Sequence, residues 1–232
     1  LKLNVLPKQL FSVKDEELLE TNLFNEKLPN PIGLAAGFDK SAEVYNSLFK
    51  LGYGLIEVGT VTPKRQLGNP KPRIFRLEKD QALINRLGFN NHGSEIISER
   101  IKTNLPNGFL GINIGPNKDT KDKENDYYLC LSRLYSLAGY VTINISSPNT
   151  DGLRDFHDQK ELEKLLTGID KIKKTKNILK PIALKLSPDL VDDEISKIIE
   201  LVMKYKIEGI IVSNTTDRNR ENLSDIKKNE TG

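Results

Sequence analysis

Six short apolar runs that alternate with amphipathic segments constrain the fold of this chain more than any other feature. The runs cover residues 31–36, 55–61, 109–115, 140–146, 181–187 and 209–215. The segments between them place apolar residues three and four positions apart, as in Leu162, Leu165 and Ile169, which is the spacing of one helix face. Strands that alternate with helices predict a parallel sheet with right-handed crossovers. The sequence therefore indicates an α/β protein.

Two parallel architectures fit this order, an open doubly wound sheet and a closed (β/α)8 barrel. In the run 182–187, large aliphatic residues alternate with small or polar ones, among them Lys185, and Asn113 and Asn144 occupy the matching face of two other runs. Aliphatic residues on one face would pack against helices, while small and polar residues on the other would line a barrel axis and its pocket. A dinucleotide-binding sheet would need Gly-x-Gly-x-x-Gly after a strand, but the nearest glycine pair precedes one. We therefore predict a TIM-type barrel, with six of its eight β/α units in this chain.

A chain of 232 residues is long enough for one barrel domain. We expect residues 1–30 to form an N-terminal hairpin region that turns at Asn25-Glu26. Residues 31–216 would then form the six β/α units, and residues 217–232 a polar loop. The chain does not begin with methionine and it stops within that loop, so we expect residues to be missing from both ends.

The composition argues against several classes of protein. A net charge of +3 with scattered lysines gives no concentrated basic surface, so nucleic-acid binding is not expected. The single cysteine, Cys130, excludes an internal disulfide and a cysteine-built zinc site, and its helical context favours a buried, unreactive side chain. No apolar run approaches the roughly 18 residues of a membrane-spanning helix, and no signal peptide is expected.

A polar cluster follows each predicted strand. The clusters are residues 37–40, 59–62, 113–118, 146–150, 185–188 and 213–216, with a further one at 85–91. Asparagine is frequent among them, and its carboxamide, which donates and accepts hydrogen bonds, suits a planar heterocycle edged with N–H and C=O groups. Carboxylates are rare there apart from Asp39, Glu57 and Asp151, which argues against metal-dependent hydrolysis and a two-carboxylate glycosidase. No metal site is expected.

Lys185 is the most specific single signal. A lysine in the middle of an apolar strand needs a negative partner or ligand, because an unpaired buried ammonium is costly. Asn113 and Asn144 on the same predicted face favour a shared ligand, and Lys40 follows small residues where backbone can approach a ring. Each of these residues also has a structural alternative. Lys185 could occupy a snorkelling or edge position, and Lys40 an exposed loop position. Asn113 and Asn144 could be core carboxamides bonded to neighbouring strands.

The remaining polar residues give weaker signals. His92 and His157 have no evident serine or acid partner, so a charge-relay hydrolase is not expected. Arg73 and Arg76 fit solvated loop charges equally well.

Five ordered segments resemble the quinone-linked, class 2 dihydroorotate dehydrogenases of pyrimidine synthesis, with similarity from about residue 28 to residue 231. The segments are residues 30–40, 57–63, 84–91, 144–150 and 213–216. The resemblance implies a flavoprotein with a (β/α)8 barrel, an FMN oxidoreductase that oxidises dihydroorotate to orotate with quinone as electron acceptor. Soluble class 1 relatives use a cysteine as base, whereas the corresponding loop here carries Ser147, and this favours class 2.

The resemblance also implies roles for individual residues. Ser147 is expected to be the catalytic base that removes a proton from C5 of dihydroorotate, through a water relay because no histidine assists it. The expected substrate contacts are Lys40, Asn85, Arg86, Leu87, Gly88, Phe89, Asn144, Asn149, Asn214 and Thr215. The expected FMN contacts are Ala35, Ala36, Gly37, Phe38, Asp39, Thr60, Asn113, Asn144, Lys185 and Ser213. Lys185 would lie near the electron-rich edge of the reduced isoalloxazine.

Two departures from the family's pattern accompany this resemblance. The family places the FMN phosphate on glycine-rich loops after the seventh and eighth strands, and this sequence does not reach them. Class 2 members also carry an N-terminal helical extension that meets the membrane and channels quinone, to which only a stub before Asp15 could belong. Arg76 would border the quinone side. The expected partners are dihydroorotate or orotate, a quinone, and a membrane surface contacted through that extension.

The expected location is therefore a peripheral one, on the cytoplasmic side of a bacterial cell membrane or on the mitochondrial inner membrane. Two alternatives stay open from the sequence. A different FMN barrel oxidoreductase could act on another planar substrate, although the asparagine-rich clusters favour dihydroorotate. An incomplete barrel could instead be an inert or partner-binding fragment, which the lack of phosphate loops would favour.

Overall fold

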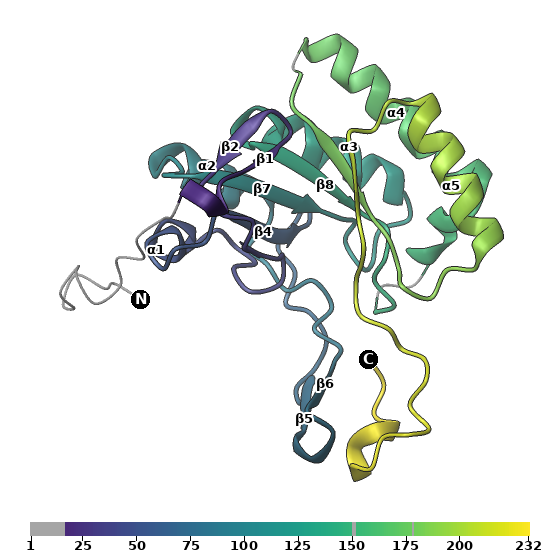
Figure 1. Ribbon diagram of the computed structural model, residues 1–232. Coiled ribbons are helices and arrows are strands. Elements are labelled where there is room, and N and C mark those ends of the chain that lie inside the picture. The colour runs from purple at the N-terminus through teal and green to yellow at the C-terminus, as the bar shows by residue number, and fades with distance from the viewer. Residues whose placement is uncertain (1–16, 150–151, 178) are drawn as a thin grey trace.

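The computed structural model describes residues 17–149, 152–177 and 179–232, and a six-stranded parallel sheet forms its centre (Figure 1). The strands are β3 (Gly33–Leu34), β4 (Leu55–Val61), β7 (Phe109–Ile114), β8 (Tyr140–Asn144), β9 (Ile182–Lys185) and β10 (Gly209–Ile211). One strand lies within each predicted apolar run. The sheet order is β10-β9-β8-β7-β4-β3, so each strand pairs with its successor in this set. A doubly wound sheet reverses its order at a switch point, and this sheet does not, which favours the predicted barrel.

Helices follow the strands and cover one side of the sheet (Figure 1). They are α1 (Tyr45–Phe49), α2 (Ser94–Thr103), α3 (Lys123–Leu134), α4 (Gln159–Lys176) and α5 (Asp192–Lys204). Short 3-10 helices are η2 (Glu17–Leu19), η3 (Glu78–Asp80), η4 (Tyr135–Leu137), η5 (Arg154–His157) and η6 (Ile226–Asn229). Across the described ranges, no helix is both long enough and apolar enough to cross a membrane.

Local sequence signals set the ends of the longer helices. The Asp158 carboxylate accepts hydrogen bonds from the backbone N–H groups of Lys160 and Glu161, at 2.9 and 3.3 Å, and starts α4. Asn177 ends α4 in the left-handed conformation, with φ of 47°. These contacts satisfy backbone groups that a helix end leaves unpaired. The cap residues therefore fix where α4 begins and ends against the sheet.

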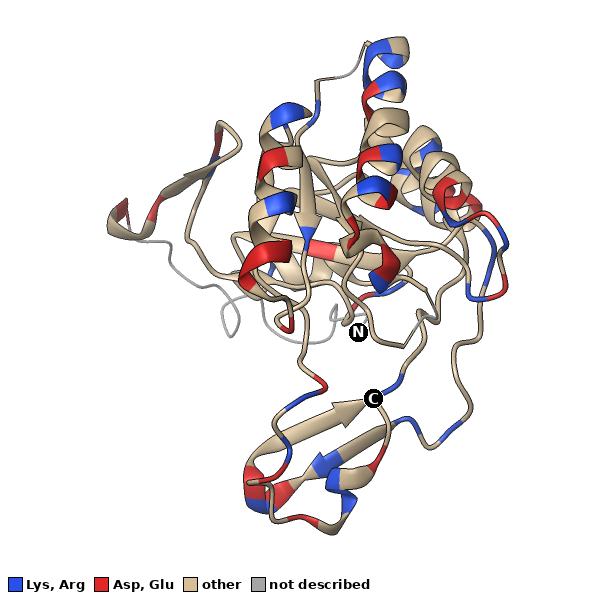
Figure 2. Cartoon of the chain, turned by 90° about the vertical axis from the view of Figure 1, so that its right-hand side faces the viewer, with Lys and Arg blue, Asp and Glu red and all other residues tan. Residues whose placement is uncertain are grey.

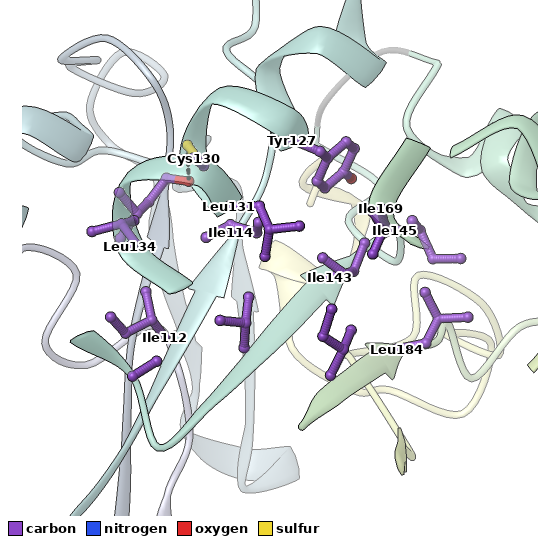
Figure 3. Close-up of a cluster of buried hydrophobic side chains, with 14 of the residues drawn as sticks. Ile112, Ile114, Tyr127, Cys130, Leu131, Leu134, Ile143, Ile145, Ile169 and Leu184 are labelled. Atoms are coloured by element: carbon purple, nitrogen blue, oxygen red, sulfur yellow. Dashed lines mark hydrogen bonds between the residues drawn. The ribbon is translucent and has the colours of Figure 1, made fainter. Parts of the chain in front are cut away.

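The core lies between the helices and the outer face of the sheet. Figure 3 shows Ile112, Ile143 and Leu184 from three neighbouring strands facing Leu131 and Ile169 from α3 and α4. All of these side chains are buried. Alternation along each strand thus puts the aliphatic residues on the helix side, as predicted.

Cys130 is buried in this core, as the sequence predicted. Its Sγ lies 3.7 Å from the carbonyl oxygen of Val61. Burial raises the pKa of the thiol well above its ordinary value, so the side chain stays protonated and unreactive.

The predicted N-terminal hairpin is present as β1 (Thr21–Leu23) and β2 (Glu26–Leu28). Its turn falls one residue earlier than predicted, at Phe24 and Asn25, which both adopt positive φ angles of 52° and 65°. Phe24 packs on the ring of Tyr140, with centroids 5.5 Å apart. The hairpin therefore covers the end of the sheet where the strands begin.

A second hairpin, β5 (Ile74–Leu77) with β6 (Ala82–Asn85), was missed by the sequence patterns, which indicated only a polar connection there. Residues 217–232 return to this hairpin, and Leu223 joins a small apolar cluster of Phe75, Leu77 and Ile84. Together they form the hairpin lobe, defined as β5, β6 and residues 217–232, which projects below the barrel with mixed charges on its surface (Figure 2).

We expect Leu131→Ala to lower the free energy of unfolding by roughly 2 to 5 kcal/mol, because the side chain is fully buried and its removal leaves a cavity. Leu129→Ala, on the same helix but 46% exposed, should cost much less and is the matched control. Chemical denaturation measures both values. Equal losses for the two variants would contradict the packing described.

Candidate functional site

Polar side chains from several loops meet at a cavity of about 180 Å³ near the carboxyl ends of the strands. Its lining residues follow β3, β4, β6, β8, β9 and β10, or end those strands. They are Ala36, Gly37, Lys40, Thr60, Asn85, Leu87, Gly88, Phe89, Asn144, Ser147, Pro148, Asn149, Lys185, Asn214 and Thr215. Because parallel strands end at one edge, residues far apart in sequence converge there. The structure thus brings together most of the residues singled out from the sequence.

A chain of buried hydrogen bonds lies behind this cavity. Asn113 Nδ2 donates to Glu57 Oε1 at 2.9 Å, and Thr60 Oγ1 donates to Asn113 Oδ1 at 2.7 Å. Asn144 Nδ2 in turn donates to Thr60 Oγ1 at 3.0 Å. Asn113 is fully buried and reaches the cavity only through Thr60. Asn113 and Asn144 are therefore core carboxamides bonded to neighbouring strands, which is one of the two interpretations of the sequence. They also support the wall of the cavity.

Two ammonium groups, on Lys40 and Lys185, face the same cavity. Burial, then the positive charges of Arg73 and Lys185, lower the pKa of Lys40 from its ordinary 10.5 to about 8. Among the described residues, no ion pair involves either lysine. Neither ammonium group therefore has a directly paired carboxylate among these residues, which suits an anionic ligand.

Ser147 lies at the cavity wall and is 5% exposed. Its Oγ accepts a hydrogen bond from the backbone N–H of Asn149 at 3.2 Å. The Asn149 side chain donates to the backbone oxygen of Asn85 at 3.2 Å, so it ties the serine loop to the end of β6. Thr150 and Asp151, which complete the predicted polar cluster, lie outside the described residues.

Four of the residues expected to contact FMN lie beside the cavity or point elsewhere. Phe38 is 66% exposed and lines a separate surface hollow, and Ala35 lines the barrel interior. The Asp39 carboxylate accepts two backbone N–H groups at the start of α1, each at 2.8 Å. The Ser213 hydroxyl donates to the backbone oxygen of Asn214 at 2.8 Å. Any contact that these residues make with a ligand would therefore involve backbone atoms or a part of the ligand outside this cavity.

Arg86, expected to contact substrate, follows β6, and its side chain packs on the hairpin lobe. Its guanidinium stacks 4.5 Å from the Phe75 ring centroid and pairs with Glu230 at 2.8 Å. The neighbouring residues Leu87, Gly88 and Phe89 do line the cavity. The arginine thus anchors the segment that carries them.

The sequence patterns missed two contributors to the site. Glu57, noted only as a rare carboxylate, is the buried end of the hydrogen-bond chain, and its one signal was a charge within an apolar strand. Arg73, whose sequence context also fitted a solvated loop charge, helps to lower the pKa of Lys40. Its guanidinium is held by backbone oxygens of Leu67 and Asn69 at 2.8 and 3.0 Å.

The arrangement of the cavity suits a planar, anionic heterocycle. Carboxamides offer hydrogen-bond donors and acceptors to ring edges, and the ammonium groups neutralise a carboxylate or an electron-rich ring. Gly37 adopts a φ of +116°, and a side chain there would project into open space beside the cavity. The backbone of this loop is therefore accessible to a flat ligand.

Comparisons with known proteins agree with this geometry. The family model for dihydroorotate dehydrogenase matches residues 18–232. The chain is 48% identical over 227 residues to the dihydroorotate dehydrogenase (quinone) of Christiangramia forsetii, covering 97% of this chain and 66% of that protein. It is 48% identical over 205 residues to the same enzyme of Bartonella tribocorum, covering 87% and 57%. The chain thus spans between about half and two thirds of these curated relatives.

Solved structures agree as well. The ligand-free dihydroorotate dehydrogenase of Eimeria tenella superposes with a TM-score of 0.89 at 38% identity, over 98% of this chain and 69% of that one. Its complex with ferulenol gives a TM-score of 0.88, also at 38% identity, over 94% of this chain and 65% of that one. The barrel prediction is thereby confirmed. With a matching family model over most of its length and these relatives, the chain belongs to the dihydroorotate dehydrogenase family.

Proposed function

We propose that this protein oxidises dihydroorotate to orotate, with FMN as the hydride acceptor and a quinone as the final electron acceptor. The observation that carries the proposal is the convergence on one cavity of two ammonium groups, several carboxamides and a nearly buried serine. The family of the chain supports the same reaction.

The substrate assignment follows from complementary chemistry. The carboxylate of dihydroorotate would pair with the Lys40 ammonium, because this group has no ion-pair partner in the described part of the chain. The ring edges would bond to the carboxamides and hydroxyl that line the cavity, which are those of Asn85, Asn144, Asn149, Asn214 and Thr215. The segment 87–89 would close the remaining side. The carboxamides and the threonine hydroxyl would therefore offer both hydrogen-bond donors and acceptors to the ring edges.

The residues at the other wall fit FMN. The open backbone at Gly37 leaves space for a flat ring, while Thr60 and Lys185 offer a hydroxyl oxygen and a cation beside it. Asn113 and Asn144 would support that wall from behind. When bound, FMN supplies the acceptor for the hydride that leaves C6 of the substrate. Lys185 would stabilise negative charge that develops on the ring.

Ser147 is the proposed base for the proton on C5 of the substrate. A serine hydroxyl is weakly basic, so its proton has to leave through water as it accepts another. The backbone N–H of Asn149, which donates to Ser147 Oγ, would stabilise the negative charge that develops on this oxygen. The serine loop is held against β6, so the oxygen keeps a fixed position at the cavity wall.

Quinone use and membrane association extend this proposal. The two curated relatives described above carry quinone in their names. Electrons held in the cavity would have to reach an acceptor that dissolves in lipid. We therefore propose a peripheral position at a bacterial cell membrane or the mitochondrial inner membrane, contacted through a helical extension that precedes the residues of this chain.

The direct test is the absorbance of the purified protein, followed by anaerobic addition of dihydroorotate and then of a quinone or dye. We expect bound flavin that bleaches with dihydroorotate and recovers with the acceptor. Bleaching by another planar substrate but not by dihydroorotate would indicate a different FMN oxidoreductase. A protein that takes up no FMN at all would instead support a non-catalytic fragment.

Ser147→Ala should slow substrate-driven flavin reduction by about a hundredfold to ten-thousandfold, the usual contribution of a general base. Flavin binding should persist, because the serine faces the substrate part of the cavity. Stopped-flow absorbance measures the reduction rate. Ser136→Ala, at an exposed position in η4, is the control and should leave the rate unchanged. An unchanged rate in Ser147→Ala would remove this residue from the proposed mechanism.

Orotate affinity should be constant well below pH 8 and should fall as the pH rises through about 8, where Lys40 loses its proton. The affinity falls with rising pH because an anionic carboxylate binds the protonated ammonium more tightly than the neutral amine. Ligand titration at a series of pH values measures the profile. In Lys40→Gln the fall near this pH should disappear, whereas Lys171→Gln, exposed on α4, should retain it. A Lys40→Gln profile like that of the unaltered protein would contradict the assignment.

A further inference from the structure

Glu57 is a buried carboxylate, 4% exposed, in the middle of β4. Three neutral donors surround it. Asn113 Nδ2 donates to Oε1 at 2.9 Å, and the hydroxyls of Tyr140 and Thr142 donate to Oε2 at 2.9 and 2.6 Å. No cation pairs with it among the described residues. A carboxylate in such a place is costly to bury, and these hydrogen bonds offset that cost.

The neighbouring strands are shaped to receive this carboxylate. A Cβ atom on Gly111 would lie 2.3 Å from the Tyr140 ring, so the glycine makes room for the ring to cross β7. Burial, and then the charge of Glu57, raise the pKa of Tyr140 far above its ordinary value, so its hydroxyl keeps the proton that it donates. The Tyr140 hydroxyl therefore requires a hydrogen-bond acceptor at the position that Glu57 occupies.

A carboxylate only accepts hydrogen bonds, and this fixes the direction of every bond that follows. Asn113 has to turn its NH2 group toward Glu57, so its carbonyl oxygen accepts from the Thr60 hydroxyl. Thr60 has then used its only proton, so it accepts from Asn144 Nδ2. The Asn144 carbonyl oxygen is occupied by the backbone N–H and the hydroxyl of Ser146, at 3.2 and 2.7 Å.

Among the residues that the structure describes, the second N–H of Asn144 Nδ2 has no partner, and this side chain lines the cavity. We propose that Glu57 is a positioning residue that sets the polarity of the Asn113–Thr60–Asn144 chain, so that Asn144 presents a hydrogen-bond donor to the ligand. The ligand atom opposite Asn144 is then an acceptor, either a carbonyl oxygen or an unprotonated ring nitrogen. The part of this inference that concerns the ligand rests on the proposed function; the orientation of Asn144 does not.

Glu57→Gln tests the orientation, because the new amide has nearly the same shape but can donate as well as accept. The readout is hydrogen exchange at the side-chain amides of Asn113 and Asn144, followed by NMR on the full chain without ligand. We expect protected amides in the unaltered chain and about a tenfold loss of protection at Asn144 in Glu57→Gln, equivalent to one lost hydrogen bond. Tyr140→Phe removes a different donor to the same carboxylate and should leave Asn144 protection unchanged.

Unchanged Asn144 protection in a folded Glu57→Gln variant would overturn the proposal. If Glu57→Gln does not fold, Thr60→Val replaces it. This variant cuts the chain next to Asn144 and should produce the same loss of protection. Unchanged Asn144 protection in that variant would overturn the proposal equally.

An FMN titration of the same variants separates this proposal from the proposed function. Weaker FMN binding in Glu57→Gln, by about tenfold, with normal binding in Tyr140→Phe supports a role toward the ligand. If the unaltered chain binds no FMN but Asn144 loses protection in Glu57→Gln, the proposed function fails and the positioning role stands. If FMN binds and Asn144 keeps its protection, the positioning role fails alone.

Discussion

The central strands of the parallel sheet, β4, β7, β8 and β9, bury both of their faces, and the two faces meet different surroundings. The outer face packs aliphatic side chains such as Ile112 and Ile143 against the helices. The inner face carries Glu57, Asn113 and Asn144, whose polar groups satisfy one another across three strands. This division makes the core stable and leaves oriented polar groups at the edge where the strands end. The polar wall of the cavity depends on this division between the two faces of the sheet.

The buried polar chain explains how a barrel interior can be both rigid and reactive. Polar groups in a core destabilise a protein unless they are paired, and here each member has a partner of the correct type. A fully satisfied network holds its side chains in one arrangement. Asn144 and Thr60 thus reach the cavity with their orientation already set by residues that never touch it. The orientation of these two side chains is therefore set by the sheet itself.

Much of the fold was predictable because its signals are local. Apolar runs located the six strands, and apolar spacing located the helices. The hairpin of β5 and β6 was missed because its strands are four residues long and its apolar cluster depends on Leu223, far along the chain. Such a pattern has too few residues to be distinguished from a loop.

The site was predictable in composition but not in geometry. Polar residues at strand ends pointed to Lys185 and Asn144, and the structure brings both to one cavity. Nothing local could separate Asp39, whose carboxylate accepts backbone N–H groups just before α1, from its neighbour Lys40, which faces the cavity. The importance of Glu57 depends on donors from β7 and β8, which only tertiary structure brings together. Hydrogen bonds between side chains on different strands therefore could not be predicted from the sequence.

The hairpin lobe joins positions that are 144 residues apart, at Arg86 with Glu230 and at Asp80 with Ser224. Closing so long a loop in an unfolded chain costs entropy, but the intervening strands bring its two ends near each other once they have assembled. Pairing between residues so far apart in the sequence is slow to form. Because only a few apolar side chains hold the lobe, it is also the part that would detach first, and it would do so while the sheet and its buried network remain intact.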